Sequence, residues 1–588
     1  MRSTELLLSA ELLQPRLEFT QATQPVNFFD LQPRASSAIR QFLQNSHRTL
    51  LMLKVDDLAE YANAVENFVE LNQALKSDIF GVHYLIEQAD SFSFPKISAQ
   101  PATSHADNFA SQKKVATALY FDQNQLLGSI RIHPSSKDIQ LNSGLVHQVN
   151  GGILILSLAG LLRQFDLWER LKHILMTKHF DWYSAHPFKA LPCDIPSFPL
   201  NLKVILLGNR EELATFSELE TGLYQWADYA EIESYFSLEN EQNQQGWANY
   251  VRCLGEQQKL TLSENAIEKL YQLFVRESEE RGLVSISPRV LTDWISSAGF
   301  NQPNSILSAV DFEQAFQQKQ YQQGFLQERT YSDILNEQIY IDTDGEVVGQ
   351  INGLSVIEYP GTPVCFGEPS RLSCIVQFGD GEVIDIERKS DLAGNLHGKG
   401  MMIAQACLSH LFDFPSQLPF SASLVFEQSY GEIDGDSASL AACCVLLSAL
   451  SDLPLPQSIA ITGTIDQFGL VHSVGGVNSK IEGFFDICKS RGLTGKQGVI
   501  IPTTVIHQLS LTDEVKSAVE NQQFFIWAVE DIHQTCEILF ERDLLEQEGK
   551  SYKNNELPLN QVISKRIEQY SEAERSSVPI WLKWFTKK

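Results

Sequence analysis

The sequence predicts a multi-domain protein that combines α/β and α+β architecture. The chain has 588 residues, more than one hydrophobic core usually holds. In its first part, short aliphatic runs at 152–156 and 203–207 alternate with helical stretches, which is typical of a parallel sheet. Beyond residue 331 the pattern changes to strands with Asp-Gly pairs, and after Asp436 helices alternate with strands.

Four regions follow in order along the chain. Residues 1–236 form a predicted α/β domain, in which the run GGILILSLAGLL at 151–162 is too short to span a bilayer and is interpreted as a buried strand followed by a turn. Residues 237–330 form a predicted helical connector, because apolar residues recur at helical spacing over 264–276. Residues 331–545 form a predicted third domain, and residues 546–588 a loosely held tail, polar except at 580–585.

Local signals predict the elements of the third domain. Asp344-Gly345 and Asp380-Gly381 lie between strand-like runs, which indicates hairpin turns. The expected elements after Asp436 are a helix over 437–450, a strand over 458–465, a helix over 480–490, strands over 498–501 and 524–529, and a helix over 531–540.

Composition excludes several classes of function. The net charge is −28 and no run of Lys and Arg interrupts it, so binding of nucleic-acid phosphate is not expected. The N-terminus carries two glutamates and no small-residue cleavage site, unlike a secretory signal. The nine cysteines contain no Cys-x-x-Cys spacing, which is typical of a reducing compartment. We therefore expect a cytoplasmic protein without a membrane partner.

A serine stands at a turn-to-helix junction in the segment GEIDGDSASL. Ser437 follows an Asp-Gly-Asp turn and precedes a stretch of small and apolar residues suited to a buried helix. Free backbone N–H groups and the positive end of the helix dipole would lie near its hydroxyl, where an oxyanion hole can form. The alternative interpretation is that Asp436 or Ser437 simply caps the helix.

A lysine stands in the first turn of a second predicted helix, after the segment VGGVNSK. The helix dipole is positive there, so that position and burial would both lower the pKa of Lys480. A neutral amine could then take the hydroxyl proton of Ser437. The alternative is a surface lysine that points into water.

The two motifs, 43 residues apart and joined by the strand SIAITGTI, together resemble the proteolytic domain of the Lon family, whose Ser–Lys dyad lies in D-G-x-S-A and G-G-x-x-x-K contexts. The resemblance covers roughly residues 339–540. It implies that Ser437 is the nucleophile and Lys480 the general base, and Thr462 and Asp434 are expected to neighbour the site. Further matching segments are QINGL at 350–354, IER at 386–388, ITG at 461–463 and GVIIP at 498–502.

Other nucleophile arrangements fit less well. The sequence contains no G-x-S-x-G elbow and no H-E-x-x-H motif, so no metal site is predicted. His472, eight residues before Lys480, could act as a base, but a histidine at a strand end is more often structural. Cys443 and Cys444 are interpreted as core residues.

The region before residue 331 resembles the AAA+ module of the Lon-like branch, but the chemistry of ATP hydrolysis is missing. The strand in 145–162 stands where a Walker B strand would, with Ser157 and Leu158 in place of its acids. The segment HRTLLMLKVDD stands where a phosphate-binding loop belongs and has no glycine. The Gly-Lys-Ser segment at Gly549–Ser551 is similar to the end of a phosphate-binding loop, but the leading glycine of that motif is missing. Residues 202–210 resemble a sensor strand, and Arg289 would begin a sensor-2 helix.

The sequence thus predicts a serine endopeptidase that cleaves unfolded or small polypeptide substrates and, by resemblance, assembles as a homo-hexameric ring. No cofactor is required in this interpretation, although the family as a class is ATP-dependent and resemblance keeps ATP and Mg²⁺ as candidates. Two alternatives stay open. One is a non-catalytic polypeptide-binding ring that serves as an adaptor or holdase. The other is an ATP-dependent protease with an unconventional nucleotide site.

Overall fold

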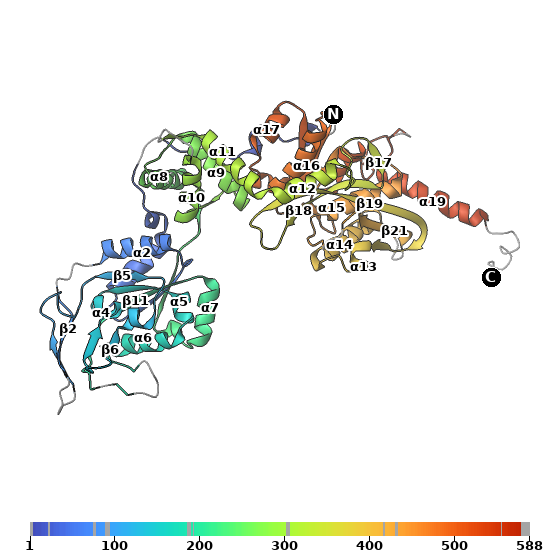
Figure 1. Cartoon of the computed structure of the whole chain (residues 1–588). Helices are drawn as coiled ribbons and strands as arrows, with labels where there is room; N and C mark the ends of the chain where they lie inside the picture. Colours follow the sequence, from blue (N-terminus) through green and yellow to red (C-terminus); the bar gives the residue numbers. More distant parts are fainter. Residues whose placement is uncertain are drawn as a thin grey trace, which may run out of the picture.

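The computed structural model describes residues 4–20, 24–73, 78–88, 95–184, 190–191, 193–300, 306–414, 418–429, 433–547, 549–553 and 556–577. Figure 1 shows an α/β lobe in blue and cyan, a group of green helices, and a larger lobe in yellow to red. Within the described residues, every helix is too short or too polar to cross a bilayer. The apolar segment predicted at 580–585 lies outside the described residues.

The first lobe is built on a five-stranded sheet in which every pair of neighbouring strands is parallel, as the sequence predicts. Its strand order is β12-β1-β11-β8-β5. The strands are β1 (Leu50–Lys54), β5 (Val115–Ala118), β8 (Ile153–Ser157), β11 (Lys203–Gly208) and β12 (Asp228–Glu231). Alternate residues of β1 enter two different cores, so both faces of the sheet are covered.

Helices cover the two faces of this sheet. They include α1 (Pro33–Gln44), α2 (Ala59–Asn72), α5 (Leu158–Leu162), α6 (Phe165–Thr177) and α7 (Arg210–Leu219). The strand predicted at 152–156 is confirmed as β8, but the predicted turn after it is wrong, because 158–162 form α5. Ser157 starts this helix by accepting the N–H of Gly160 at 2.9 Å.

In its described residues, the connector contains four main helices: α8 (Glu241–Gln257), α9 (Glu264–Ser278), α10 (Pro288–Gly299) and α11 (Ala309–Gln323). The periodicity of the sequence predicts α9 correctly, and its apolar face is buried. A further helix, α12 (Phe325–Leu335), carries the chain to the third region. Residue 331 is therefore helical, and the strands begin only at β17 (Glu346–Val348).

The connector is held to the third region by buried polar contacts. The guanidinium of Arg276, near the end of α9, forms a two-point ion pair with the carboxylate of Glu482 on α16 (Val477–Arg491), and both side chains are largely buried. Arg281 donates to the carbonyl of Leu509 at 2.9 Å. Because removing one partner of such a buried pair leaves an uncompensated charge, these contacts fix the orientation of the two parts.

The third region is built on a seven-stranded sheet in the order β20-β21-β19-β18-β23-β26-β27. β18, β19 and β21 pair antiparallel, and β18, β23, β26 and β27 pair parallel. The bounds are β18 (Gln350–Glu358), β19 (Cys365–Gly381), β20 (Val383–Asp385), β21 (Leu418–Phe426), β23 (Ile459–Ile461), β26 (Gln497–Pro502) and β27 (Phe524–Val529).

The predicted Asp-Gly hairpins are wrong. Asp344-Gly345 precedes β17, which pairs with the distant β22 (Pro454–Pro456), and Asp380-Gly381 belongs to an irregular stretch of β19 itself. The hairpin of this sheet instead joins β18 to β19 through residues 359–364. Its register is set by the long β18–β19 pairing, which a two-residue turn signal cannot detect.

The elements after Asp436 follow the predicted order with shifted ends. The predicted helices are α15 (Ser439–Ser451), α16 and α18 (Ile532–Phe540), and the strands at 498–501 and 524–529 are β26 and β27. The strand predicted over 458–465 is broken into β23 and β24 (Thr464–Ile465) by Thr462 and Gly463. The helix α17 (Asp513–Glu520) is not predicted.

The predicted loose tail is wrong for the described part of that segment. Residues 559–577 form α19 (Leu559–Ser577), and Leu559 and Ile563 are completely buried in the core that contains α15. Arg566 also donates to the carbonyl of Leu450 at 2.8 Å. The sequence of this segment is mostly polar, but Leu559, Ile563 and the partly buried Ile567 recur one turn apart and form an apolar face that docks on the core.

Residues 7–14 lie against the third region, close to α17 (Figure 1). The N–H of Leu8 donates to Ile526 of β27 at 2.9 Å. Leu13 is fully buried among residues of α16 and α17, and Gln14 donates to the carbonyl of Leu511. This N-terminal strap, residues 7–14, thus completes a lobe formed otherwise by the end of the chain.

Candidate active site

Ser437 and Lys480 come together at the carboxyl end of β23. The helix after Ser437, α15, packs in one core and α16 packs in the other, so the two helices lie on opposite faces of the sheet. The chain after β23 joins them: the N–H of Gly463 donates to the carbonyl of Ser437 at 2.9 Å. Sites in sheets with parallel strands form at such carboxyl ends, where loops from both faces meet.

The hydroxyl of Ser437 is free of the capping role that the alternative interpretation gives it. α15 starts at Ser439, its N-cap is Ala438, and no side chain caps it. Asp436 instead accepts a hydrogen bond from Thr464 at 3.1 Å. Ser437 is only partly buried, so its Oγ is available to the pocket described below.

Lys480 is 4% exposed, and its Nζ lies 3.1 Å from Oγ of Ser437. Burial lowers the pKa of Lys480 from 10.5 to about 8, while the carboxylates of Glu279 and Asp436 act in the opposite direction. The predicted position in the first turn of its helix is confirmed, because α16 begins at Val477. The neutral amine is thus a populated minor form near physiological pH, unlike that of an ordinary lysine.

The two expected neighbours of the site have different positions. Thr462 is fully buried, and its Oγ1 lies 3.3 Å from Nζ of Lys480. Asp434 lines the same pocket as Ser437 and Lys480 but forms no hydrogen bond with either among the described residues. Its Oδ1 instead accepts the N–H groups of Leu396 and His397, in the first turn of α14 (Asn395–Leu411). Thr462 therefore touches the dyad, whereas Asp434 anchors the loop before Ser437.

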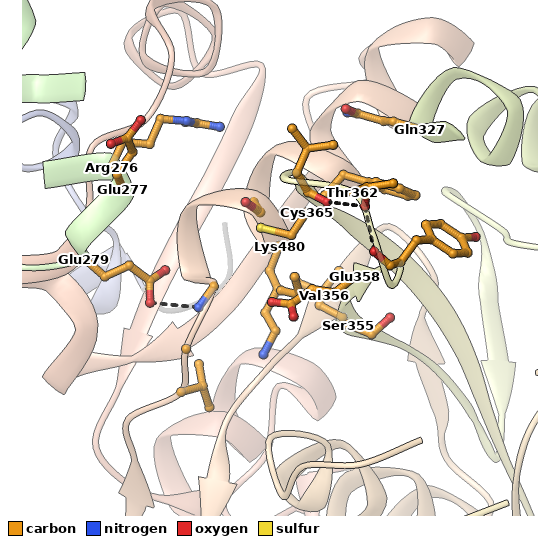
Figure 2. A pocket seen from close by; sticks show the side chains of 18 of the residues that line it. Arg276, Glu277, Glu279, Gln327, Ser355, Val356, Glu358, Thr362, Cys365 and Lys480 are labelled. Carbon is orange, nitrogen blue, oxygen red and sulfur yellow. Dashed lines mark hydrogen bonds between the residues drawn. The ribbon is translucent and has the colours of Figure 1, made fainter. Parts of the chain in front are cut away.

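A cavity of about 1020 Å³ opens beside the dyad. Figure 2 shows the amine of Lys480 pointing into it, between the β18–β19 hairpin and the end of α9. The hairpin contributes Ser355, Val356, Glu358, Thr362 and Cys365, and the connector contributes Arg276, Glu277, Glu279 and Gln327. The connector therefore forms one wall of the site, a contribution that the sequence pattern does not predict.

Glu279 is the connector residue whose charge acts on the pKa of Lys480. It ends α9 in a left-handed conformation, with φ of 55°, and its carboxylate accepts the N–H of Gly476 at 2.9 Å. Gly476 is the N-cap of α16, the helix that carries Lys480. A single charged residue at a helix end carries no motif, so no signal in the sequence singles it out.

The competing candidates lie elsewhere. The ring of His472 is half exposed, and its Nε2 lies 3.0 Å from Asp466 rather than near Ser437. Cys443 and Cys444 are fully buried core residues, as predicted, and burial and the neighbouring thiol groups raise the pKa of each. All nine cysteines are free thiols.

The first lobe contains the positions that the resemblance relates to a nucleotide site. β1 passes into α2 through residues 55–58, which contain no glycine. The Ser157 hydroxyl, at the end of β8, donates to the carboxylate of Asp57 in this connection, and burial raises the pKa of Asp57. Leu158 is fully buried. A carboxylate in this position would repel a phosphate group rather than bind it.

The remaining nucleotide-site positions have structural partners. Asn209 is the N-cap of α7, where its side chain accepts the N–H of Glu212 at 3.0 Å. Arg289 lies in the first turn of α10, half exposed and 4.0 Å from Asp293. The Gly549–Ser551 segment follows α18, and its Lys550 pairs with Asp543.

Two family models match the chain. One, described as "LonB-like, AAA domain", matches residues 112–226, and one described as "Lon protease (S16) C-terminal proteolytic domain" matches residues 431–541. A "Putative Lon protease homolog" of Haemophilus influenzae is 64% identical over 577 residues, which cover 98% of this chain and 96% of that protein. A protein of the same name from Escherichia coli is 43% identical over 564 residues, 95% of this chain and 94% of its own length. An "Archaeal Lon protease" of Thermoplasma volcanium is 22% identical over 418 residues, 66% of this chain and 60% of that protein.

Proposed function

This chain belongs to the Lon protease family and is a serine peptidase, and from this premise we propose that it is an endopeptidase in which Ser437 is the nucleophile and Lys480 the general base. The observation that carries the proposal is the 3.1 Å separation of Nζ of Lys480 and Oγ of Ser437. A scaffold that only binds polypeptides would have no use for this pair, since a buried lysine costs stability. The adaptor or holdase alternative is therefore less well supported.

In the proposed mechanism the neutral amine of Lys480 accepts the hydroxyl proton as Oγ of Ser437 attacks the carbonyl carbon of the scissile peptide bond. The resulting ammonium returns a proton to the leaving amine, and an acyl-enzyme remains on Ser437. Water then attacks the ester with Lys480 again as base. Thr462, 3.3 Å from Nζ, holds the amine in place through these steps.

Backbone groups beside Ser437 supply the stabilisation of the oxyanion. The N–H groups of Ser437 and Ala438 have no hydrogen-bond partner among the described residues, and they precede the first turn of α15. Such groups, at the positive end of a long buried helix, stabilise the negative charge that develops on the carbonyl oxygen. Removing one donor of this kind typically costs about 10²–10³-fold in kcat.

We further propose that peptide hydrolysis here does not use ATP, so that no nucleotide cofactor is required. Support comes from the glycine-free connection after β1 and from the Asp57 carboxylate bound to Ser157. With Leu158 buried beside them, the residues that would hold magnesium and position water are replaced. The substrates are then unfolded or small polypeptides, which reach the site without mechanical unfolding.

The assembly is proposed to be a closed homo-hexameric ring with the active sites inside it. The family membership supports this arrangement, and homo-oligomers commonly have closed symmetry. A closed ring would limit access to the sites inside it. The cytoplasm is the proposed location, in agreement with nine free thiols.

One experiment tests the central proposal. The purified protein is incubated with a fluorophosphonate probe, with and without ATP, and the modified residue is located by peptide mass spectrometry. We expect covalent labelling at Ser437 in both conditions, and cleavage of a casein-type substrate at the same rates. Cleavage of casein without modification of Ser437, or modification at another serine that accounts for the activity, would contradict the proposal.

A further inference from the structure

A second group of buried polar side chains lies at the base of the loop that carries Ser437. Asp385 ends β20, Glu387 lies in the short helix α13 (Ile386–Lys389), and His397 lies in the first turn of α14. Each offers one ligand atom, and these three atoms lie within 4.8 Å of one another. His397 is fully buried, and the side chain of Asp385 is 10% exposed. The proposed peptidase mechanism uses none of them.

Within the described part of the chain, the His397 ring has two buried nitrogen atoms without hydrogen bonds, and one of them faces the carboxylate of Asp385. Its Nε2 lies 3.3 Å from Oδ2 of Asp385, yet neither ring nitrogen forms a hydrogen bond with a described residue, and neither does Oδ2 of Asp385. Buried polar atoms without partners are rare in folded proteins because each loses its bonds to water. Their convergence therefore points to a ligand that all three side chains share.

The site brings two carboxylates and one imidazole close together in a largely buried position. A divalent cation compensates the negative charge of such a buried carboxylate pair and accepts the imidazole nitrogen as a further ligand.

We propose that Asp385, Glu387 and His397 form a binding site for one divalent transition-metal ion, with Zn²⁺ as the best match. One imidazole nitrogen and two carboxylate oxygens are a ligand set that zinc accepts, with a water molecule in the fourth position. Bonds of about 2.0–2.1 Å at the tetrahedral angle place two ligand atoms about 3.3–3.4 Å apart. The 3.3 Å between Nε2 of His397 and Oδ2 of Asp385 has this length.

The ion would brace the nucleophile loop. Residues 427–436 connect β21 to Ser437, and the site's own elements hold both ends of this loop. At its start, the N–H of Phe426 donates to the Glu387 carboxylate at 2.8 Å. At its end, Ile433 exchanges backbone hydrogen bonds with Leu392 and Gly394, between the two ligand-bearing helices. An ion bound by both α13 and α14 would therefore hold in place the segment between these two helices, to which the loop before Ser437 is hydrogen-bonded.

The test measures metal binding, so its outcome is independent of whether the peptidase proposal holds. The full-length protein is treated with a chelator and dialysed, then titrated with Zn²⁺ against a chromophoric competitor, and bound metal is counted by mass spectrometry. We expect about one equivalent of Zn²⁺ and a rise in the melting temperature. Asp385→Asn and His397→Gln should each weaken binding by more than about a hundredfold.

His173→Gln is the matched control, because His173 forms an Asp–His pair with Asp181 at 3.1 Å on the exposed surface of the first lobe. It should bind Zn²⁺ as the unchanged protein does. The absorption spectrum of Co²⁺ added to the unchanged protein is a second test that needs no variant, and an intense band of a tetrahedral site is expected. Absence of a tight equivalent together with a weak octahedral Co²⁺ spectrum, or binding unaffected in folded Asp385→Asn protein, would overturn the proposal.

Discussion

The carboxylate of Glu279, at the end of α9 in the connector, accepts a hydrogen bond from the backbone N–H of Gly476 at 2.9 Å. Gly476 is the N-cap of the helix that carries Lys480, so this bond joins the connector to the proposed general base. The same carboxylate raises the pKa of Lys480 against the larger lowering effect of burial. The connector thus acts on the peptidase site through position and through charge.

The first prediction concerns the dyad. Ser437→Ala and Lys480→Ala should each reduce peptidase kcat by more than about a thousandfold, because nucleophile and base act as a unit. Lys480→Arg should be equally inactive, since a guanidinium does not lose its proton. Lys489→Ala, an exposed lysine of the same helix paired with Glu514, is the control. Hydrolysis of a fluorogenic peptide is the measurement, and near-normal turnover by Lys480→Ala would redirect attention to His472.

The second prediction concerns pH. Because the base must be neutral and the pKa of Lys480 is about 8, kcat/KM should rise with pH and level off above about 8. Glu279→Gln keeps an acceptor for Gly476 but removes the charge that stabilises the ammonium, so the rising limb should move to lower pH. Glu279→Ala should also lower kcat, because the hydrogen bond is lost. Glu277→Gln, another pocket carboxylate, is the control for charge alone. An unshifted limb in Glu279→Gln would exclude this coupling.

The third prediction concerns stability. The folded protein binds the Lys480 proton less tightly than the unfolded chain, whose lysine has a pKa of 10.5. The destabilisation is complete below pH 8 and declines as pH rises from 8 to 10.5. Lys480→Met should therefore increase the free energy of unfolding at pH 7 by an amount on the order of 3 kcal/mol, and raise the melting temperature accordingly. This gain in stability should shrink above pH 8. Calorimetry across this pH range decides it, with Lys489→Met as the exposed control.

The fourth prediction concerns ATP. The purified protein should release no phosphate from ATP above background, and a stably folded substrate should resist cleavage with ATP present. Short peptides should be cleaved at the same rate with or without the nucleotide. Arg289 is half exposed and leaves room for weak anion binding. Robust hydrolysis that Asn209→Ala or Arg289→Ala eliminates would instead reveal a working, unconventional ATPase.

The fifth prediction concerns assembly. Multi-angle light scattering at micromolar concentration should give the mass of a closed ring, and Ser437→Ala should give the same mass because its side chain lies in the pocket. A stable monomer that retains full peptidase activity would contradict the proposed hexamer.

The placement of each dyad residue near the start of a helix could be predicted because helical periodicity and a glycine-containing motif lie on one contiguous segment in each case, whereas the pairing of Ser437 with Lys480 is implied only by the resemblance to the Lon family. The helix of Lys480 begins within a few residues of its predicted position, and β27 has its predicted ends. The elements that the sequence does not predict correctly depend on contacts between residues far apart in the chain. The α19 helix is stabilised by burial of Leu559 and Ile563 against a helix about a hundred residues earlier, and the hairpin at 359–364 by pairing along a long strand.

Contacts between residues far apart in the chain also explain which parts of the site the motifs do not predict. Glu279 lies far from Lys480 in sequence, and only the docking of α9 through Arg276 and Glu482 brings it near. The segment IER at 386–388 was recognised as a match to the family, but its meeting with His397 depends on how α13 and α14 pack.

The N-terminal strap has a consequence for biosynthesis. Gln14 bonds to Leu511, 497 positions later, so the strap leaves the ribosome long before the segment against which it folds. At about 5–20 residues per second this delay is roughly 25–100 s. During that time Leu13 has no pocket to enter, because α16 and α17 do not yet exist. The peptidase lobe therefore closes only after α16 and α17 have been made, and a nascent chain that lacks them does not form the complete lobe.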